Sequence, residues 1–97
     1  MTDTDVPTII LADGAVMPQL GLGVFKTPAE ETAEVVRDAI AAGYRAVDTA
    51  AIYGNEEGVG RALDGRDDIF LTTKLWNTDQ GYDEALRAFD ASLGRLV

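Results

Sequence analysis

Three polar residues of types that can move a proton lie at or between the ends of two expected strands. Asp48 closes the run 44–48, Lys74 follows the run 69–73, and Tyr53 lies between them. A free tyrosine phenol has a pKa of about 10, and a neighbouring ammonium lowers that pKa by favouring the phenolate. A carboxylate partner keeps a buried lysine charged. On this interpretation Tyr53 is a general acid, Lys74 tunes its pKa, and Asp48 holds Lys74.

The same three residues also fit a purely structural role. Asp48 would then cap a turn, Lys74 would be solvated, and Tyr53 would pack within its loop. Phe25 and Trp76 also follow expected strands, where they either wall a pocket for a carbonyl compound or pack as ordinary aromatic side chains. Residue types and spacing alone leave both interpretations open.

The elements that must position these side chains begin with an expected β-hairpin. Short apolar runs at 8–11 and 15–17 flank the pair Asp13-Gly14. An Asp-Gly pair between two such runs is typical of a hairpin turn. A further apolar run at 21–24 predicts a short strand, with glycines where the backbone can be closely approached.

A helix is predicted next, with a marked start and stop. Thr27 fits the N-cap of a capping box, Pro28 fits the first helical position, and Glu30 lies three residues after the cap. Gly43 supplies the stop. The apolar stripe of this helix consists of Val36, Ala39 and Ile40.

Alternating strands and helices make up the rest of the chain. The expected order is a strand at 44–48, a helix at 56–63 ended by Gly65, a buried strand at 69–73 and an amphipathic helix at 82–96. The apolar face of the last helix consists of Tyr82, Leu86, Phe89, Leu93 and Leu96. Such β/α alternation predicts parallel strands, either in an open doubly wound sheet or in an eight-stranded barrel. In both architectures, active sites gather at the carboxyl ends of the strands.

Composition excludes several classes of function. The 97 residues allow one domain, and a net charge of -9 repels nucleic acid and anionic membranes. The chain has no cysteine and no histidine, which excludes disulfides, His-based zinc sites and Ser-His triads, and we expect no metal. Residues 1–7 contain no basic residue, so no signal peptide is predicted, and no apolar run is long enough to span a bilayer. We therefore expect a cytoplasmic protein.

Two glycine pairs begin like a dinucleotide-binding fingerprint. The segments 21–23 and 58–60 both read Gly-x-Gly, but Lys26 and Leu63 stand where the third glycine belongs. The second copy also lies inside an expected helix instead of between a strand and a helix. The sequence therefore does not support a Rossmann phosphate loop.

Several separate motifs agree in order with one known family. Segment 43–50 reads Gly-Tyr-Arg-Ala-Val-Asp-Thr-Ala, and 53–56 and 58–60 read Tyr-Gly-Asn-Glu and Gly-Val-Gly. Segment 72–76 reads Thr-Thr-Lys-Leu-Trp, and the expected hairpin is followed by Gly-Leu-Gly at 21–23. Together these motifs resemble the aldo-keto reductase family.

The resemblance extends from about Ile9 to Leu96. Within the family it is strongest to the bacterial 2,5-diketo-gluconate reductase type, partly through segment 51–60. It implies an α/β fold in which 1–97 forms the N-terminal part of a single (β/α)8 TIM barrel domain. This part would consist of the β-hairpin and the first three βα units, and the hairpin would cover the amino-terminal end of the barrel. It also implies NADPH-dependent reduction of small aldehydes and ketones, with a tyrosine as the general acid. Full-length members of the family are usually monomeric.

The resemblance also implies roles for particular residues. Asp48, Tyr53 and Lys74 match the catalytic aspartate, tyrosine and lysine of the family. Gly23, Val24 and Asp48 match positions near the nicotinamide end of the cofactor. The positions that line the substrate pocket are Phe25, Ile52, Trp76 and Asn77.

Three departures from the family pattern set the expectation for this chain alone. The family's catalytic histidine is absent, and the chain stops at Val97. The connection 64–68 is also shorter than usual, so we expect the helix before it to end early or to pack differently. Three of eight βα units leave two sheet edges open. We therefore expect no activity from this fragment by itself. The alternative is a non-catalytic partial-barrel module that self-associates or binds cofactor without turnover.

Overall fold

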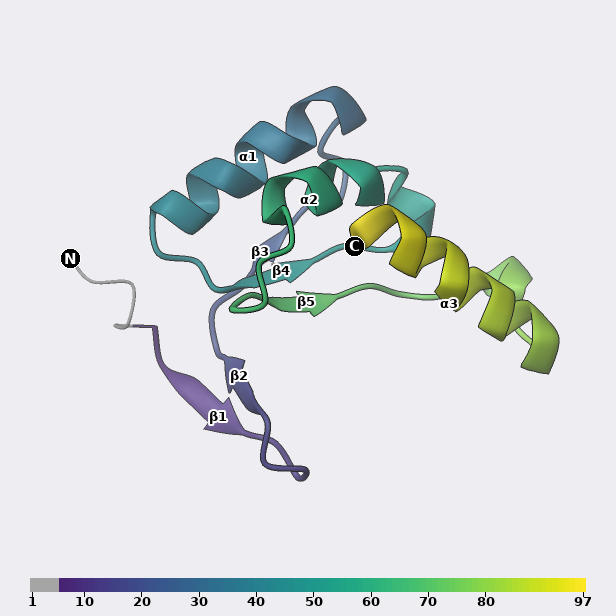
Figure 1. Ribbon diagram of the computed structural model, residues 1–97, viewed down its shortest axis with the longest axis horizontal. Helices are drawn as coiled ribbons and strands as arrows, with labels where there is room; N and C mark the ends of the chain where they lie inside the picture. The colour runs from purple at the N-terminus through teal and green to yellow at the C-terminus, as the bar shows by residue number, and fades with distance from the viewer. Residues whose placement is uncertain (1–5) are drawn as a thin grey trace.

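The computed structural model describes residues 6–97, which form two small sheets and three α-helices (Figure 1). The prediction that residues 1–7 hold no signal peptide falls mostly on residues 1–5, which lie outside the described residues. In Figure 1 the first two helices lie above the strands of the larger sheet, the third lies to their right, and the N-terminal hairpin projects below the sheet. Within the described residues, no helix combines the length and apolar character needed to cross a membrane.

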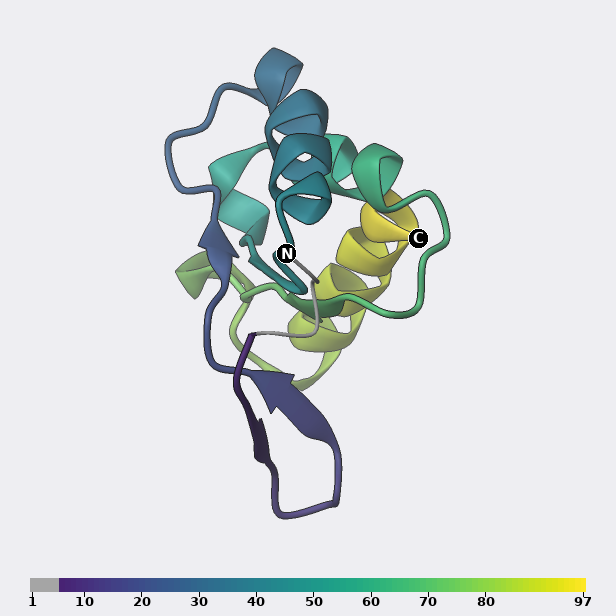
Figure 2. The ribbon, with the colours of Figure 1, turned by 90° about the vertical axis from the view of Figure 1, so that its left-hand side faces the viewer.

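The predicted hairpin is confirmed. Strands β1 (Thr8–Ile10) and β2 (Val16–Pro18) pair antiparallel, with Ile9 opposite Met17. The hairpin stands clear of the helices in Figure 2. Residues of β2 and residues 67–70 line a common depression, which places the hairpin beside the start of β5 (Phe70–Thr72).

The larger sheet is parallel, in the order β3 (Leu22–Gly23), β4 (Ala46–Asp48) and β5. Gly23 pairs with Asp48, and Asp48 pairs with Thr72. Because the strands are parallel, their carboxyl ends meet at one edge, as the β/α alternation predicts. The strand predicted at 69–73 is shorter than expected and is half-buried instead of buried, since it is an outer strand of this sheet.

Helices α1 (Ala29–Ala41) and α2 (Glu56–Leu63) cover the sheet and close the core. Val36 of α1, Val47 of β4 and Val59 of α2 are all at most 1% exposed. The predicted capping box is wrong. Pro28 occupies the N-cap without a side-chain cap, and Thr32 instead donates its hydroxyl to the Pro28 carbonyl at 2.8 Å.

Glycines allow α2 to lie close to both neighbouring helices. A Cβ at Gly58 would lie 2.9 Å from the Thr32 Cβ of α1, and a Cβ at Gly60 would lie 3.0 Å from the Leu96 Cα of α3 (Tyr82–Leu96). The Gly-Val-Gly segment at 58–60 therefore serves helix packing, in agreement with the rejection of a phosphate loop. The shortened connection after α2 does not end the helix early, because Leu63 is still helical and Asp64 and Gly65 turn the chain with positive φ.

Helix α3 forms over the predicted range, but its predicted apolar face is largely uncovered. Leu96 is 7% exposed and packs in the core. The other members of that face are 46–83% exposed, namely Tyr82, Leu86, Phe89 and Leu93. The helix instead turns Ser92 toward the rest of the protein, at 6% exposed.

Candidate active site

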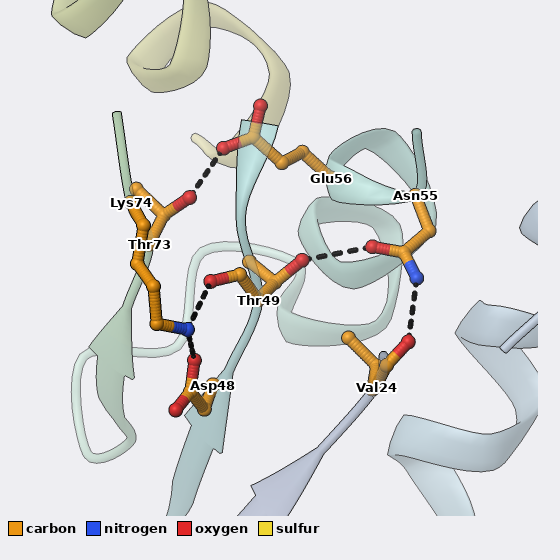
Figure 3. Close-up of polar contacts among 7 residues, drawn as sticks. All are labelled: Val24, Asp48, Thr49, Asn55, Glu56, Thr73 and Lys74. Carbon is orange, nitrogen blue, oxygen red and sulfur yellow. Dashed lines mark hydrogen bonds and ion pairs between the residues drawn. The ribbon is translucent and has the colours of Figure 1, made fainter. Parts of the chain in front are cut away.

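Asp48 and Lys74 form an ion pair at the carboxyl edge of the sheet (Figure 3). Asp48 ends β4, and Lys74 lies two residues beyond β5. The Lys74 ammonium also donates to the carbonyl of Thr49 at 3.1 Å. Both charged side chains are about half exposed, at 48% and 50%. The pairing at neighbouring strand ends is therefore present, although Lys74 is not the buried lysine that the sequence suggested.

Tyr53 lies beside this ion pair. It ends the short 3₁₀ helix η2 (Ala51–Tyr53), after which Gly54 turns the chain with a φ of +72°. The Lys74 Nζ lies 5.4 Å from the centroid of the Tyr53 ring. The structure thus places Lys74 next to both of the other residues singled out from the sequence, Asp48 and Tyr53.

The pKa of Lys74 is raised above its ordinary value. The main cause is the hydrogen bond to Asp48, supported by the negative charge of Asp48 and by Tyr53, while partial burial acts in the opposite direction. Lys74 therefore carries its positive charge throughout the neutral pH range. The Lys74 ammonium is therefore a fixed positive charge next to the Tyr53 ring.

The three residues expected near a cofactor also meet at this edge. Gly23 pairs with Asp48, and the Val24 amide donates to the Asp48 carbonyl at 3.1 Å. A Cβ at Gly23 would meet open space, so the backbone there can be approached by another group. The Val24 side chain is completely buried in the core, which leaves only its backbone for any ligand contact.

The four residues expected to line a substrate pocket are all exposed, and the structure connects them to the site to different degrees. Phe25 packs against Tyr53, with ring centroids 5.2 Å apart. Within residues 6–97, this is the one aromatic ring contact between the set and Tyr53. Ile52 precedes Tyr53 in η2, and Trp76 and Asn77 lie where the chain leaves Lys74 and enters η3 (Asn77–Asp79).

Asn55 is a supporting residue to which the sequence analysis gave no role. Its side chain is 1% exposed, accepts the Thr49 hydroxyl at 2.8 Å, and donates to the carbonyls of Val24 at 2.9 Å and Thr27 at 3.2 Å. It thereby holds the turn that contains Lys26, a residue with a φ of +64°. The sequence feature that points to Asn55 is the motif Tyr-Gly-Asn-Glu at 53–56, in which Asn55 and Glu56 follow the tyrosine.

Glu56 is the second supporting residue that the sequence analysis did not single out. Its carboxylate is 1% exposed and accepts hydrogen bonds from Thr73, Ser92 and Arg95, at 2.6, 3.1 and 2.7 Å. Burial raises the pKa of Glu56, but these hydrogen bonds and the charge of Arg95 outweigh that effect and hold the pKa below its usual value. Glu56 is therefore an ionised carboxylate within the protein at neutral pH.

Comparisons with known proteins find relatives over most of this chain. The family described as "Aldo/keto reductase family" matches residues 18–97. An "Aldo-keto reductase" of Mycolicibacterium smegmatis is 58% identical over 93% of this chain and 34% of its own length. The "Methylglyoxal reductase DkgA" of Yersinia pestis is 52% identical over 93% of this chain and 33% of its own length.

A solved structure shares the fold of this chain. A point mutant of Gox0644 in complex with NADPH superposes with a TM-score of 0.90 and 56% identity, over 94% of this chain and 34% of the other. The chain thus spans about a third of the length of the relatives that it matches. The resemblance to the 2,5-diketo-gluconate reductase type in particular stays a prediction.

Proposed function

The chain belongs to the aldo/keto reductase family, and from this membership we propose that its function is the NADPH-dependent reduction of aldehydes and ketones to alcohols. The observation that carries the proposal is the Asp48–Lys74 ion pair with Tyr53 beside it, at the carboxyl edge of a parallel sheet. We propose further that residues 1–97 contribute the hairpin and the first three βα units of a (β/α)8 barrel domain.

The residues at this edge fit the nicotinamide end of NADPH. Gly23 leaves open space beside Asp48, and Val24 offers its backbone there. Gly23, Val24 and Asp48 would hold the cofactor, and a related protein has been solved with NADPH. When bound, reduced nicotinamide supplies the hydride that reduces the carbonyl carbon.

The chain's own residues supply the proton and the charge that this reduction needs. The Tyr53 phenol donates its proton to the carbonyl oxygen, so that the C=O bond becomes an alcohol and the tyrosine becomes a phenolate. The Lys74 ammonium stabilises that phenolate, and Asp48 keeps the ammonium in place. Phe25, Ile52, Trp76 and Asn77 would line the pocket that receives a small carbonyl substrate.

A chimera tests this proposal. This chain would replace the matching N-terminal segment of the methylglyoxal reductase of Yersinia pestis, whose aligned part is 52% identical. We expect the chimera to oxidise NADPH in the presence of methylglyoxal, measured by the absorbance of the reduced nicotinamide, and we expect the chain alone to show no turnover. A folded chimera that binds NADPH but does not turn over would contradict the proposed function.

A second candidate function rests on the uncovered side of α3. Tyr82, Leu86 and Phe89 together expose an apolar strip that a partner surface would bury. On this candidate the chain is a non-catalytic module that associates with a second copy of itself through α3. Sedimentation of the chain alone should then show a dimer, and Phe89→Glu should return it to a monomer, whereas a monomeric unaltered chain would exclude the candidate.

A further inference from the structure

Lys74 is carried by a segment that lies beyond the regular strand. β5 ends at Thr72, and the two residues that follow have no regular secondary structure. Toward β4, backbone hydrogen bonds run from the Thr49 amide to Thr72 at 2.8 Å and from the Ala51 amide to Lys74 at 3.2 Å. On its other side, β5 has no strand partner within the described residues. Within the described residues, strand pairing therefore supports the segment that carries Lys74 on one side only.

Glu56 provides a fixed point next to this segment. One carboxylate oxygen accepts from Ser92 and from Arg95, both on α3, and the other accepts the Thr73 hydroxyl. Glu56 is also the first residue of α2, where the helix dipole favours a negative charge. Because its side chain is 1% exposed and accepts three charge-assisted hydrogen bonds, the carboxylate has little freedom to move.

Thr73 and Lys74 are consecutive residues whose side chains bind different partners, Glu56 and Asp48. Figure 3 shows the Thr73 hydroxyl directed at Glu56 and the Lys74 ammonium directed away, at Asp48 and Thr49. Holding one side chain therefore fixes the direction of the next. We propose that Glu56 is a positioning residue for Lys74: anchored by α3, it holds the Thr73 hydroxyl and thereby aims the ammonium at Asp48.

This inference rests on the proposed function for its catalytic meaning, but its test needs no turnover. Lys26 and Lys74 are the only lysines in the sequence. Brief treatment of the full chain with a limiting amount of acetic anhydride at mildly alkaline pH modifies only the uncharged amine. Mass spectrometry of the peptides then gives the ratio of Lys74 to Lys26 acetylation, in which Lys26 is the internal reference.

The informative variant is Thr73→Val, which keeps the shape and the β-branch but removes the hydroxyl. We expect it to raise the ratio of Lys74 to Lys26 acetylation by about threefold or more. Weaker pairing with Asp48 leaves a larger fraction of the Lys74 amine uncharged, and only the uncharged amine reacts. Asp48→Asn removes the charge of the carboxylate partner altogether, so it should give the largest increase in the acetylation ratio. Thr73→Ser retains the hydroxyl and should keep the unaltered ratio.

A destabilised variant with no change at Thr73 distinguishes a specific effect on the Lys74 side chain from a general loss of stability. Val36→Ala creates a cavity in the core but removes none of the hydrogen bonds of Glu56, so it should lower the free energy of unfolding while leaving the ratio unchanged. The proposal is overturned if Thr73→Val keeps the unaltered ratio, if Asp48→Asn fails to raise it, or if Val36→Ala raises it equally. Failure of the proposed function would appear differently, as a folded chimera without turnover whose labelling ratio is normal.

Discussion

Replacing Tyr53 with phenylalanine is expected to lower the kcat of the chimera by about 100- to 10,000-fold, the usual contribution of a general acid. Phenylalanine keeps the ring that packs on Phe25 but has no proton to give to the carbonyl oxygen. The measurement is the steady-state rate of NADPH oxidation with methylglyoxal at saturating substrate. The affinity for NADPH, followed by its fluorescence, should change little, because the lost hydroxyl is assigned to proton transfer.

Tyr82→Phe is the matched control for this experiment. It makes the same chemical change at a residue that is 83% exposed at the start of α3 and has no assigned role in proton transfer. We expect its kcat to equal that of the unaltered chimera. If Tyr53→Phe retained a kcat within a few-fold of the unaltered value, Tyr53 would not be the acid.

Replacing Gly60 with alanine is expected to destabilise the chain by about 3 kcal/mol. A Cβ at this position would overlap the Arg95 carbonyl oxygen and lie 3.0 Å from the Leu96 Cα, so α3 would have to move away from α2. The added clash is with backbone, which cannot turn aside as a flexible side chain can. Helix propensity alone predicts the opposite sign, a gain of up to about 1 kcal/mol. Urea unfolding followed by circular dichroism measures the difference.

Gly94→Ala is the control with the opposite expected sign. Gly94 lies on α3, and a Cβ there meets open space, so only the helix propensity changes. We expect a gain of about 0.5 kcal/mol, less than in a helix interior because Gly94 is close to the helix end. Equal stabilisation by Gly60→Ala would show that α2 and α3 do not pack as closely in solution as they do in this structure.

Local patterns predicted most of the fold because each one reports on its own segment. Helix α2 has the bounds expected from its apolar spacing, and the hairpin forms around the predicted Asp-Gly turn. The error at the start of α1 has a local cause. Thr27 and Glu30 have the spacing of a capping box, but Pro28 takes the N-cap position with an extended backbone, which leaves Thr27 outside the helix.

The face that a helix buries depends on which elements surround it. The apolar spacing of α3 predicts its length, but Leu86 and Phe89 are exposed while Ser92 is buried, because the polar side of the helix meets Glu56. No periodicity distinguishes a polar residue that will be buried and hydrogen-bonded from one that will face water. The Asn-Glu pair at 55–56 is visible in the sequence, but the hydrogen-bond partners of Asn55 and Glu56 follow only from the tertiary structure.

The sequence by itself determined the order of the strands and helices, and it placed Asp48 and Lys74 at the ends of neighbouring parallel strands, because strand ends and side-chain spacing are properties of a short stretch of chain. Only the tertiary structure decided how Lys74 is aimed. That depends on a carboxylate from α2, a hydroxyl next to the lysine and a guanidinium from α3 meeting at one point, up to 39 residues apart in the chain. Such a meeting is fixed by the docking of the helices, which buries the Glu56 carboxylate and so requires it to be paired.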